Sequence, residues 1–184
     1  MYHTFFIVFI VFFTFNCSNV RNVSQQDNVK IVQLSEMNMT GITVKATMNN
    51  MSEIPGAWQK IFAYKAKLNH IIEPDSMWGV SYNYRNINGE FQFNYMAAFR
   101  VKEFNTNIAG VSTFTVPAQK YAVFVHKGSV NTLGKAYDYI MKQWLPNSPY
   151  VSGGICDLEL YGRDFKMNSP KSKIYIYISL KKRA

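Results

Sequence analysis

The residue with the clearest chemical potential in this sequence is Glu159, a carboxylate in an aromatic-rich segment. The segment 155–161 alternates in a way that predicts a strand with successive side chains on opposite faces. One face carries Ile155, Asp157, Glu159 and Tyr161, and the other carries Cys156, Leu158 and Leu160. A glutamate in an apolar pocket attracts a cation, and aromatic faces add cation–π contacts. The alternative is that Glu159 lies on a solvent-facing strand surface.

The same carboxylate also suits hydrolysis. Glu159 would then be a general base acting on water, with a tyrosine donating to the leaving oxygen. Tyr82, Tyr95, Tyr137 and Tyr177 are the candidates, and the sequence does not choose among them. The sequence offers no Ser-His-Asp, Cys-His or metal set for other hydrolytic chemistry. Ligand binding, hydrolysis and a protein-interaction role therefore stay open, with no cofactor indicated.

The elements before Glu159 must position it. An apolar run predicts a strand over 121–127, and Gly128-Ser129 end it. Apolar residues at spacings of three and four predict a helix over 130–145, which Pro146 ends. The apolar face of strand 155–161 is expected to pack on this helix. Glu159 is therefore expected to point to the opposite face of the sheet.

The order of elements occurs twice along the chain. Strand, helix, strand and strand are predicted over 41–48, 54–69, 77–84 and 91–101, and again over 121–127, 130–145, 155–161 and 173–180. Segments 29–34 and 111–116 also have strand character, and Asn88-Gly89 predicts a hairpin turn. The fold class is therefore α+β, with duplicated β-α-β-β units in a largely antiparallel curved sheet. We expect both helices on one face and a ligand cleft on the other, at the pseudo-twofold junction.

Composition limits the kinds of partner. The chain has 184 residues, 16% of them aromatic, and a formal charge of +9. The basic residues are scattered, apart from Lys181-Lys182-Arg183, and no helix-turn-helix or zinc-finger pattern is present. Direct binding to nucleic acid is not expected. Only Cys17 and Cys156 are cysteines, no histidine has metal-ligand spacing, and no metal site is indicated.

The first residues resemble an export signal. An apolar run over 5–13 is too short to span a bilayer, which takes roughly 20 residues, and it precedes Cys17. We expect a lipoprotein-like signal at 1–17, a flexible tether at 18–28 and one domain at 29–184. Cys17 is the candidate lipidation site. The protein is then exported and attached to a membrane through its N-terminus, or cytoplasmic if the segment is no signal.

Several motifs resemble the GyrI-like, or AraC-type effector-binding, domain over residues 30 to 181. They are Pro117-Ala118 with Tyr121-Ala122-Val123-Phe124, Ala136-Tyr137, Trp144-Leu145-Pro146, Asp157-Leu158-Glu159 and Ile174-Tyr175-Ile176-Tyr177-Ile178. The resemblance implies an aromatic pocket for bulky, often cationic, small molecules, and it places Glu159 at the pocket floor. Some members of this family hydrolyse cyclopropane-bearing toxins. The regulators in it carry a DNA-binding segment that this sequence is expected to lack.

The candidate ligand-binding residues combine Glu159 with aromatic side chains. They are Glu159, Trp78, Tyr82, Tyr95, Tyr137, Tyr150, Tyr161 and Tyr177. The expected partner is a small molecule with a lipophilic or cationic character.

Overall fold

A computed structural model describes residues 29–47, 49–104 and 107–183. The expected signal segment, the tether and Cys17 lie outside the described residues. Among the helices that are described, none combines the length and apolar character needed to cross a membrane.

Nine strands and two helices make up the described fold. The strands are β1 (Lys30–Leu34), β2 (Met37–Thr47), β3 (Met77–Ile87), β4 (Glu90–Val101), β5 (Ser112–Val116), β6 (Gln119–Lys127), β7 (Tyr150–Ser152), β8 (Cys156–Tyr161) and β9 (Lys173–Lys182). Helix α1 (Glu53–Tyr64) continues into the 3-10 turn Lys65–Lys67. Helix α2 (Leu133–Tyr139) lies between the 3-10 turn Val130–Thr132 and the π-helical turn Ile140–Trp144.

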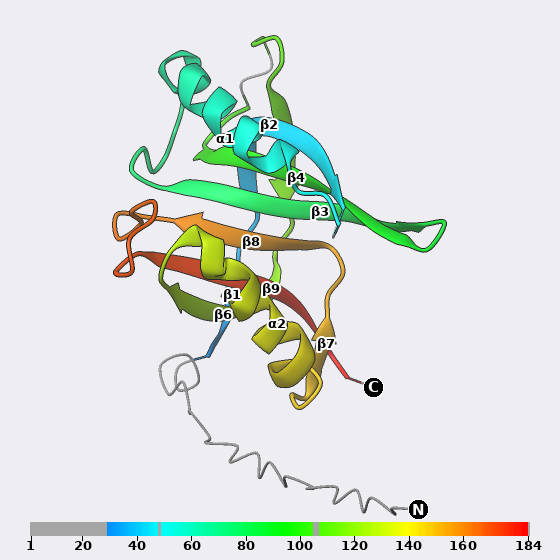
Figure 1. Cartoon of the computed structure of the whole chain (residues 1–184). Coiled ribbons are helices and arrows are strands. Elements are labelled where there is room, and N and C mark those ends of the chain that lie inside the picture. The colour runs from blue at the N-terminus through cyan, green and yellow to red at the C-terminus, as the bar shows by residue number, and fades with distance from the viewer. Residues whose placement is uncertain (1–28, 48, 105–106, 184) are drawn as a thin grey trace, which may run out of the picture.

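The sheet confirms the duplication. Its strand order is β1-β6-β9-β8-β3-β4-β2-β5, with β7 pairing on the end of β9, and all pairs are antiparallel. This order is symmetric about the β8–β3 pair, because β2-α1-β3-β4 and β6-α2-β8-β9 are equivalent units. Figure 1 shows the two units above and below that central pair. The α+β fold with a curved antiparallel sheet is as predicted.

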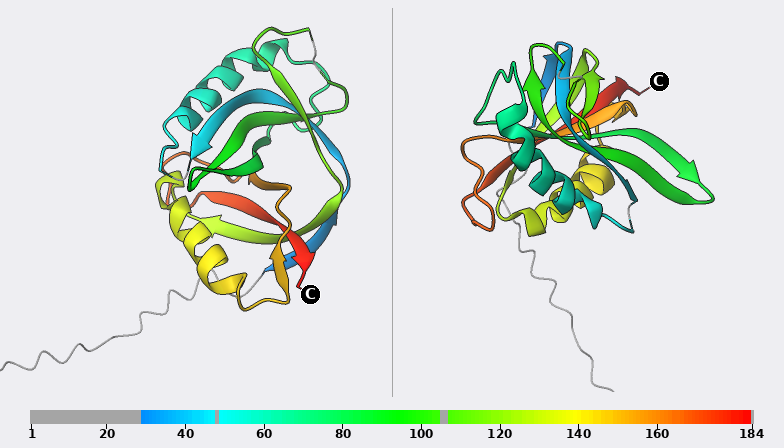
Figure 2. Two further views of the ribbon diagram at one scale, coloured as in Figure 1. Left: turned by 90° about the vertical axis from the view of Figure 1, so that its right-hand side faces the viewer. Right: turned by 90° about the horizontal axis from the view of Figure 1, so that it is seen from above.

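The two faces of the sheet have different cores. Both helices lie on one side of the sheet (Figure 2), α1 over β2 and β4 and α2 over β6 and β9. The helix-free side is filled by a third cluster that includes Val80, Met96, Tyr121, Cys156 and Leu158. Two apolar faces are therefore buried, one under the helices and one inside the curl of the sheet.

This packing corrects the expected direction of Glu159. The apolar face of β8, with Cys156 and Leu158, packs into the helix-free cluster and not onto α2. Glu159 consequently points to the helix side, where Tyr137 of α2 reaches it. The candidate site lies on the helix side of the sheet, not opposite the helices where we expected it.

Three local features differ in how well the sequence predicted them. The hairpin between β3 and β4 turns at Asn88 and Gly89, whose φ angles of 53° and 83° fit the expected tight turn. The short strand β7 was not predicted, because its three residues gain strand geometry only by pairing with Leu180–Lys182. The helix expected over 130–145 is present, but as three successive helical types.

Candidate functional site

Glu159 lies at the centre of the molecule, where the two repeated units meet. It is paired with Gly79 across the β8–β3 ladder. Only 7% of the residue is exposed to solvent. A Cβ at position 79 would overlap the Tyr95 hydroxyl and lie 2.8 Å from Glu159 Oε2. The absence of a side chain at Gly79 therefore makes the space in which the carboxylate and this phenol meet.

Three tyrosine hydroxyls donate hydrogen bonds to the Glu159 carboxylate. Tyr95 and Tyr161 donate to Oε2 over 2.9 and 2.7 Å, and Tyr137 donates to Oε1 over 2.8 Å. They come from β4, β8 and α2, so both repeats contribute. A hydrogen bond from a neutral donor to an ionised carboxylate is stronger than a hydrogen bond between two neutral groups. The three phenols therefore hold the carboxylate in place without neutralising its charge.

The three phenols differ in accessibility. Tyr95 and Tyr161 are buried, with 3% and 6% of each residue exposed. Tyr137 is half-buried, although its hydroxyl lies inside against Glu159. Of the three phenols that donate to Glu159, Tyr137 on α2 is therefore the most exposed to solvent.

A further aromatic layer surrounds the phenols. Trp58 of α1 packs edge-on against Tyr95 and Tyr161, with ring centroids 6.3 and 4.9 Å apart. Phe165 also packs edge-on against Tyr161, with ring centroids 4.9 Å apart. Trp58 directly follows the buried Ala57 of α1, just as Tyr137 follows the buried Ala136 of α2. The two helices thus present equivalent aromatic positions to the site.

Burial governs the electrostatics of these phenols. The pKa values of Tyr95, Tyr137 and Tyr161 all lie well above the ordinary value of 10.0, first because of burial and second because of the Glu159 charge. The phenols therefore stay protonated and act as donors. A buried carboxylate surrounded by donors and π faces is an acceptor for positive charge.

A second buried carboxylate, Asp157, has its own partners. It accepts hydrogen bonds from the backbone N–H and hydroxyl of Ser179 and from the Tyr84 hydroxyl, over 2.8, 3.0 and 3.0 Å. Burial raises its pKa above the ordinary value of 3.8. Since its donors come from β9 and β3, which flank β8, Asp157 ties the central strands together. The described residues include no group of three His, Cys, Asp or Glu side chains that could hold a metal ion.

The family model for the GyrI-like small-molecule binding domain matches residues 27–181. The chain belongs to this GyrI-like family. It is 29% identical over 124 residues to the transcriptional regulator BrlR of Pseudomonas aeruginosa. The aligned region covers 67% of this chain and 44% of that protein. The matched region is therefore less than half the length of that curated relative.

Solved structures share the GyrI-like fold. SAV2435 bound to tetraphenylphosphonium has a TM-score of 0.65 at 18% identity, covering 84% of this chain and 94% of that one. The C-terminal domain of EcmrR has a TM-score of 0.63 at 18% identity, covering 85% and 98%. An integron cassette protein of Vibrio cholerae has a TM-score of 0.63 at 19% identity, covering 85% and 97%. These similarities establish the fold.

The structure separates the predicted site residues of this GyrI-like domain into two groups. Tyr95, Tyr137 and Tyr161 meet at Glu159. The other aromatic candidates lie elsewhere: Trp78, Tyr82 and Tyr177 pack in or against the helix-free core, and Tyr150 packs against the core under α2. Tyr82 is stacked on Phe114 at 4.1 Å, which fixes it away from Glu159.

Two residues of the GyrI-like site were missed by the sequence analysis. Trp58 lies in the helix predicted over 54–69 and Gly79 in the strand predicted over 77–84, but neither was named as a candidate. A tryptophan on a buried stripe carries an N–H that needs a partner, and a glycine inside a strand marks a close approach. Those two signals were available in the sequence. The pairing of Gly79 with Glu159 across β3 and β8 could not be predicted from the sequence.

Removing the Tyr137 hydroxyl tests whether its hydrogen bond to Glu159 stabilises the fold. We expect Tyr137→Phe to lower the free energy of unfolding by about 1.5 kcal/mol, because it leaves Glu159 Oε1 without its donor. Tyr139→Phe on the same helix is the control, since the Tyr139 hydroxyl makes no hydrogen bond to the described residues. Urea unfolding followed by tryptophan fluorescence gives both values. Equal stability of the two variants would contradict a role for the Tyr137 hydroxyl.

Proposed function

We propose that this protein binds lipophilic cations at Glu159, among the aromatic side chains that α1 and α2 contribute around it. The observation that carries the proposal is a buried carboxylate with three phenolic donors, at the junction of a duplicated small-molecule binding fold. The presence of tetraphenylphosphonium in the similar structure of SAV2435 supports the choice of ligand class.

The energetics favour cations over neutral compounds. A ligand that reaches Glu159 must displace the Tyr137 hydroxyl, which sacrifices a hydrogen bond of about 1.5–3 kcal/mol. A cation about 4 Å from the carboxylate gains roughly 4 kcal/mol at an effective dielectric near 20. Contact with the faces of Trp58 and the tyrosines adds roughly 0.5–2 kcal/mol each. A neutral aromatic makes the ring contacts but lacks the charge attraction that offsets the displaced donor.

The same geometry argues for binding rather than hydrolysis. Both oxygens of Glu159 already accept phenolic hydrogen bonds, two at Oε2 and one at Oε1, so a water molecule has to compete with these donors for the carboxylate. A general base must form a hydrogen bond to the water that it activates. We therefore propose Glu159 as a recognition group, with the phenols as its positioning residues.

Replacing the carboxylate by its amide isolates the charge. We expect Glu159→Gln to weaken tetraphenylphosphonium binding tenfold or more, by about 1.4 kcal/mol, and to leave a neutral aromatic such as triphenylmethanol nearly unchanged. Isothermal titration calorimetry on residues 28–184 measures both affinities. Glu36→Gln removes the same charge from an exposed position and is the matched control. Equal weakening of cation and neutral aromatic would show that charge is not what the site recognises.

A further inference from the structure

A hollow lies on the surface beside the Glu159 site. Its volume is about 340 Å³, and it opens between the C-terminal end of α1 and the loop that joins β8 to β9. Phe62, Met77, Tyr161 and Phe165 give it apolar walls. Small-molecule pockets in proteins begin at about 300 Å³. The hollow is therefore large enough for a small ligand.

The charges at this hollow are unbalanced. Three charged side chains line it, Lys65, Arg163 and Asp75. Arg163 pairs with Asp75 at 3.2 Å. Lys65 donates to the Pro74 carbonyl over 2.7 Å, and a carbonyl does not neutralise its charge. Across the described part of the chain, no carboxylate lies within ion-pair distance of Lys65, so the hollow carries one net positive charge.

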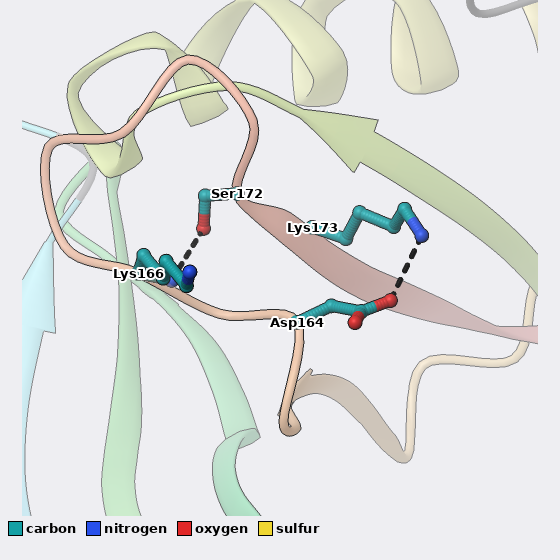
Figure 3. A network of polar contacts seen from close by, with 4 residues as sticks. All are labelled: Asp164, Lys166, Ser172 and Lys173. Atoms are coloured by element: carbon teal, nitrogen blue, oxygen red, sulfur yellow. Dashed lines mark hydrogen bonds and ion pairs between the residues drawn. The ribbon is translucent and has the colours of Figure 1, made fainter.

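The loop on one side of the hollow is held in shape. Figure 3 shows two hydrogen bonds that hold this loop. Lys173 Nζ donates to Asp164 Oδ2 over 2.8 Å, and the Lys166 N–H donates to Ser172 Oγ over 3.0 Å. Ser172 is fully buried, and the Lys173 N–H also bonds the Asp164 carbonyl. These contacts flank Phe165 on both sides in the sequence. The wall that Phe165 provides is thus formed before any ligand arrives.

Tyr161 is shared between the hollow and the Glu159 site. Its hydroxyl donates to Glu159, and its ring lines the hollow and packs against Phe165. The two places are neighbours that share this residue, but their charges differ in sign. Glu159 is negative, whereas the hollow is positive.

We propose that this hollow is a separate binding site for lipophilic monoanions, compounds with an apolar body and one negative charge. The apolar body lies against Phe62, Met77 and Phe165, and the anionic group faces Lys65. Arg163 is shared with Asp75 and is a weaker partner. The inference does not depend on the proposed binding of cations at Glu159, because different residues carry it.

Two probes of the same shape and opposite charge separate the sites. Tetraphenylborate is the anion and tetraphenylphosphonium is the cation, and both are titrated into residues 28–184 by calorimetry. We expect Lys65→Gln to weaken tetraphenylborate about fivefold to tenfold and to leave tetraphenylphosphonium unchanged. Lys45→Gln, an exposed strand lysine outside the hollow, is the matched control and should change neither. Because the contact is between partly exposed charges, the tetraphenylborate affinity should also fall with added salt.

A spectroscopic measurement locates the anion independently of the variants. With ¹³C-methyl-labelled methionine, tetraphenylborate should shift the Met77 signal and leave those of Met39 and Met96, which are fully buried in the helix-free core. The inference is overturned if tetraphenylborate does not bind at millimolar concentration, or binds without shifting Met77 or responding to Lys65→Gln. Loss of tetraphenylborate binding in Glu159→Gln would also overturn it. Failure of tetraphenylphosphonium to bind concerns only the proposed function.

Discussion

Gly79→Ala is expected to lower the free energy of unfolding by about 3 kcal/mol. Alanine normally suits a strand better than glycine does, so the expected sign is opposite to the intrinsic preference. The added Cβ would overlap the Tyr95 hydroxyl and lie 2.8 Å from Glu159 Oε2. Tyr95 is 3% exposed and packs against Trp58 with ring centroids 6.3 Å apart, which hinders the ring from turning aside. Overpacking of about 1–3 kcal/mol therefore adds to a charged hydrogen bond of about 1.5–3 kcal/mol.

Two further variants show whether the cause is this contact. Gly56→Ala on α1 is the matched control, because a Cβ there meets nothing within 4 Å. It should stabilise the protein slightly, since alanine is the better helix former. Tyr95→Phe removes the atom nearest to the new methyl group, so adding it to Gly79→Ala should recover part of the loss. A double variant whose losses simply add, measured by urea unfolding, would contradict direct contact between positions 79 and 95.

Hydrophobic periodicity predicted both helices, every strand except β7, and the duplication of the element order. The stripe through Ile61 and the one through Ile140 each mark a helix that packs on the sheet, as the structure confirms. The alternation of side chains along β8 also placed Glu159 and Leu158 correctly on opposite faces of the strand. Alternation states which residues share a face, but not what covers that face. Because this sheet buries apolar side chains on both sides, the helix side of β8 could not be chosen from the pattern alone.

Predicting the candidate site would have required knowing which residues far apart in the chain come into contact. Glu159 meets its partners only after β8 pairs with β3 in a register that places it opposite Gly79. No local motif encodes that register. Aromatic content predicted a pocket, but Trp78 and Tyr82 have the same residue types as Trp58 and Tyr95 and pack in the opposite core. Which tyrosines face the carboxylate is therefore a property of tertiary structure.

The same arrangement of phenols should make the protein sensitive to alkaline pH. Tyr95, Tyr137 and Tyr161 have pKa values well above 10.0 in the folded state, because of burial and the nearby charge of Glu159. In the unfolded chain these tyrosines lose their protons near pH 10. Above that pH the unfolded state binds fewer protons than the folded state, so the free energy of unfolding falls as pH rises. Below pH 10 the contribution of these groups is fully present.

Each tyrosine that keeps its proton only in the folded state contributes a slope of about 1.4 kcal/mol per pH unit. The three site tyrosines together should contribute up to about 4 kcal/mol per pH unit, enough to unfold a domain of ordinary stability within roughly two units. Urea unfolding at pH 9, 10, 10.5 and 11 measures the slope. Tyr137→Phe should be less stable at pH 9 but should lose stability less steeply, by about 1.4 kcal/mol per unit, because phenylalanine has no proton to lose. Lysines and other buried groups that titrate in this range are common to both proteins, so the difference in slope reports Tyr137 alone. An unchanged slope would mean that the Tyr137 hydroxyl titrates in the folded state as it does in the unfolded chain, and that it is not held against Glu159.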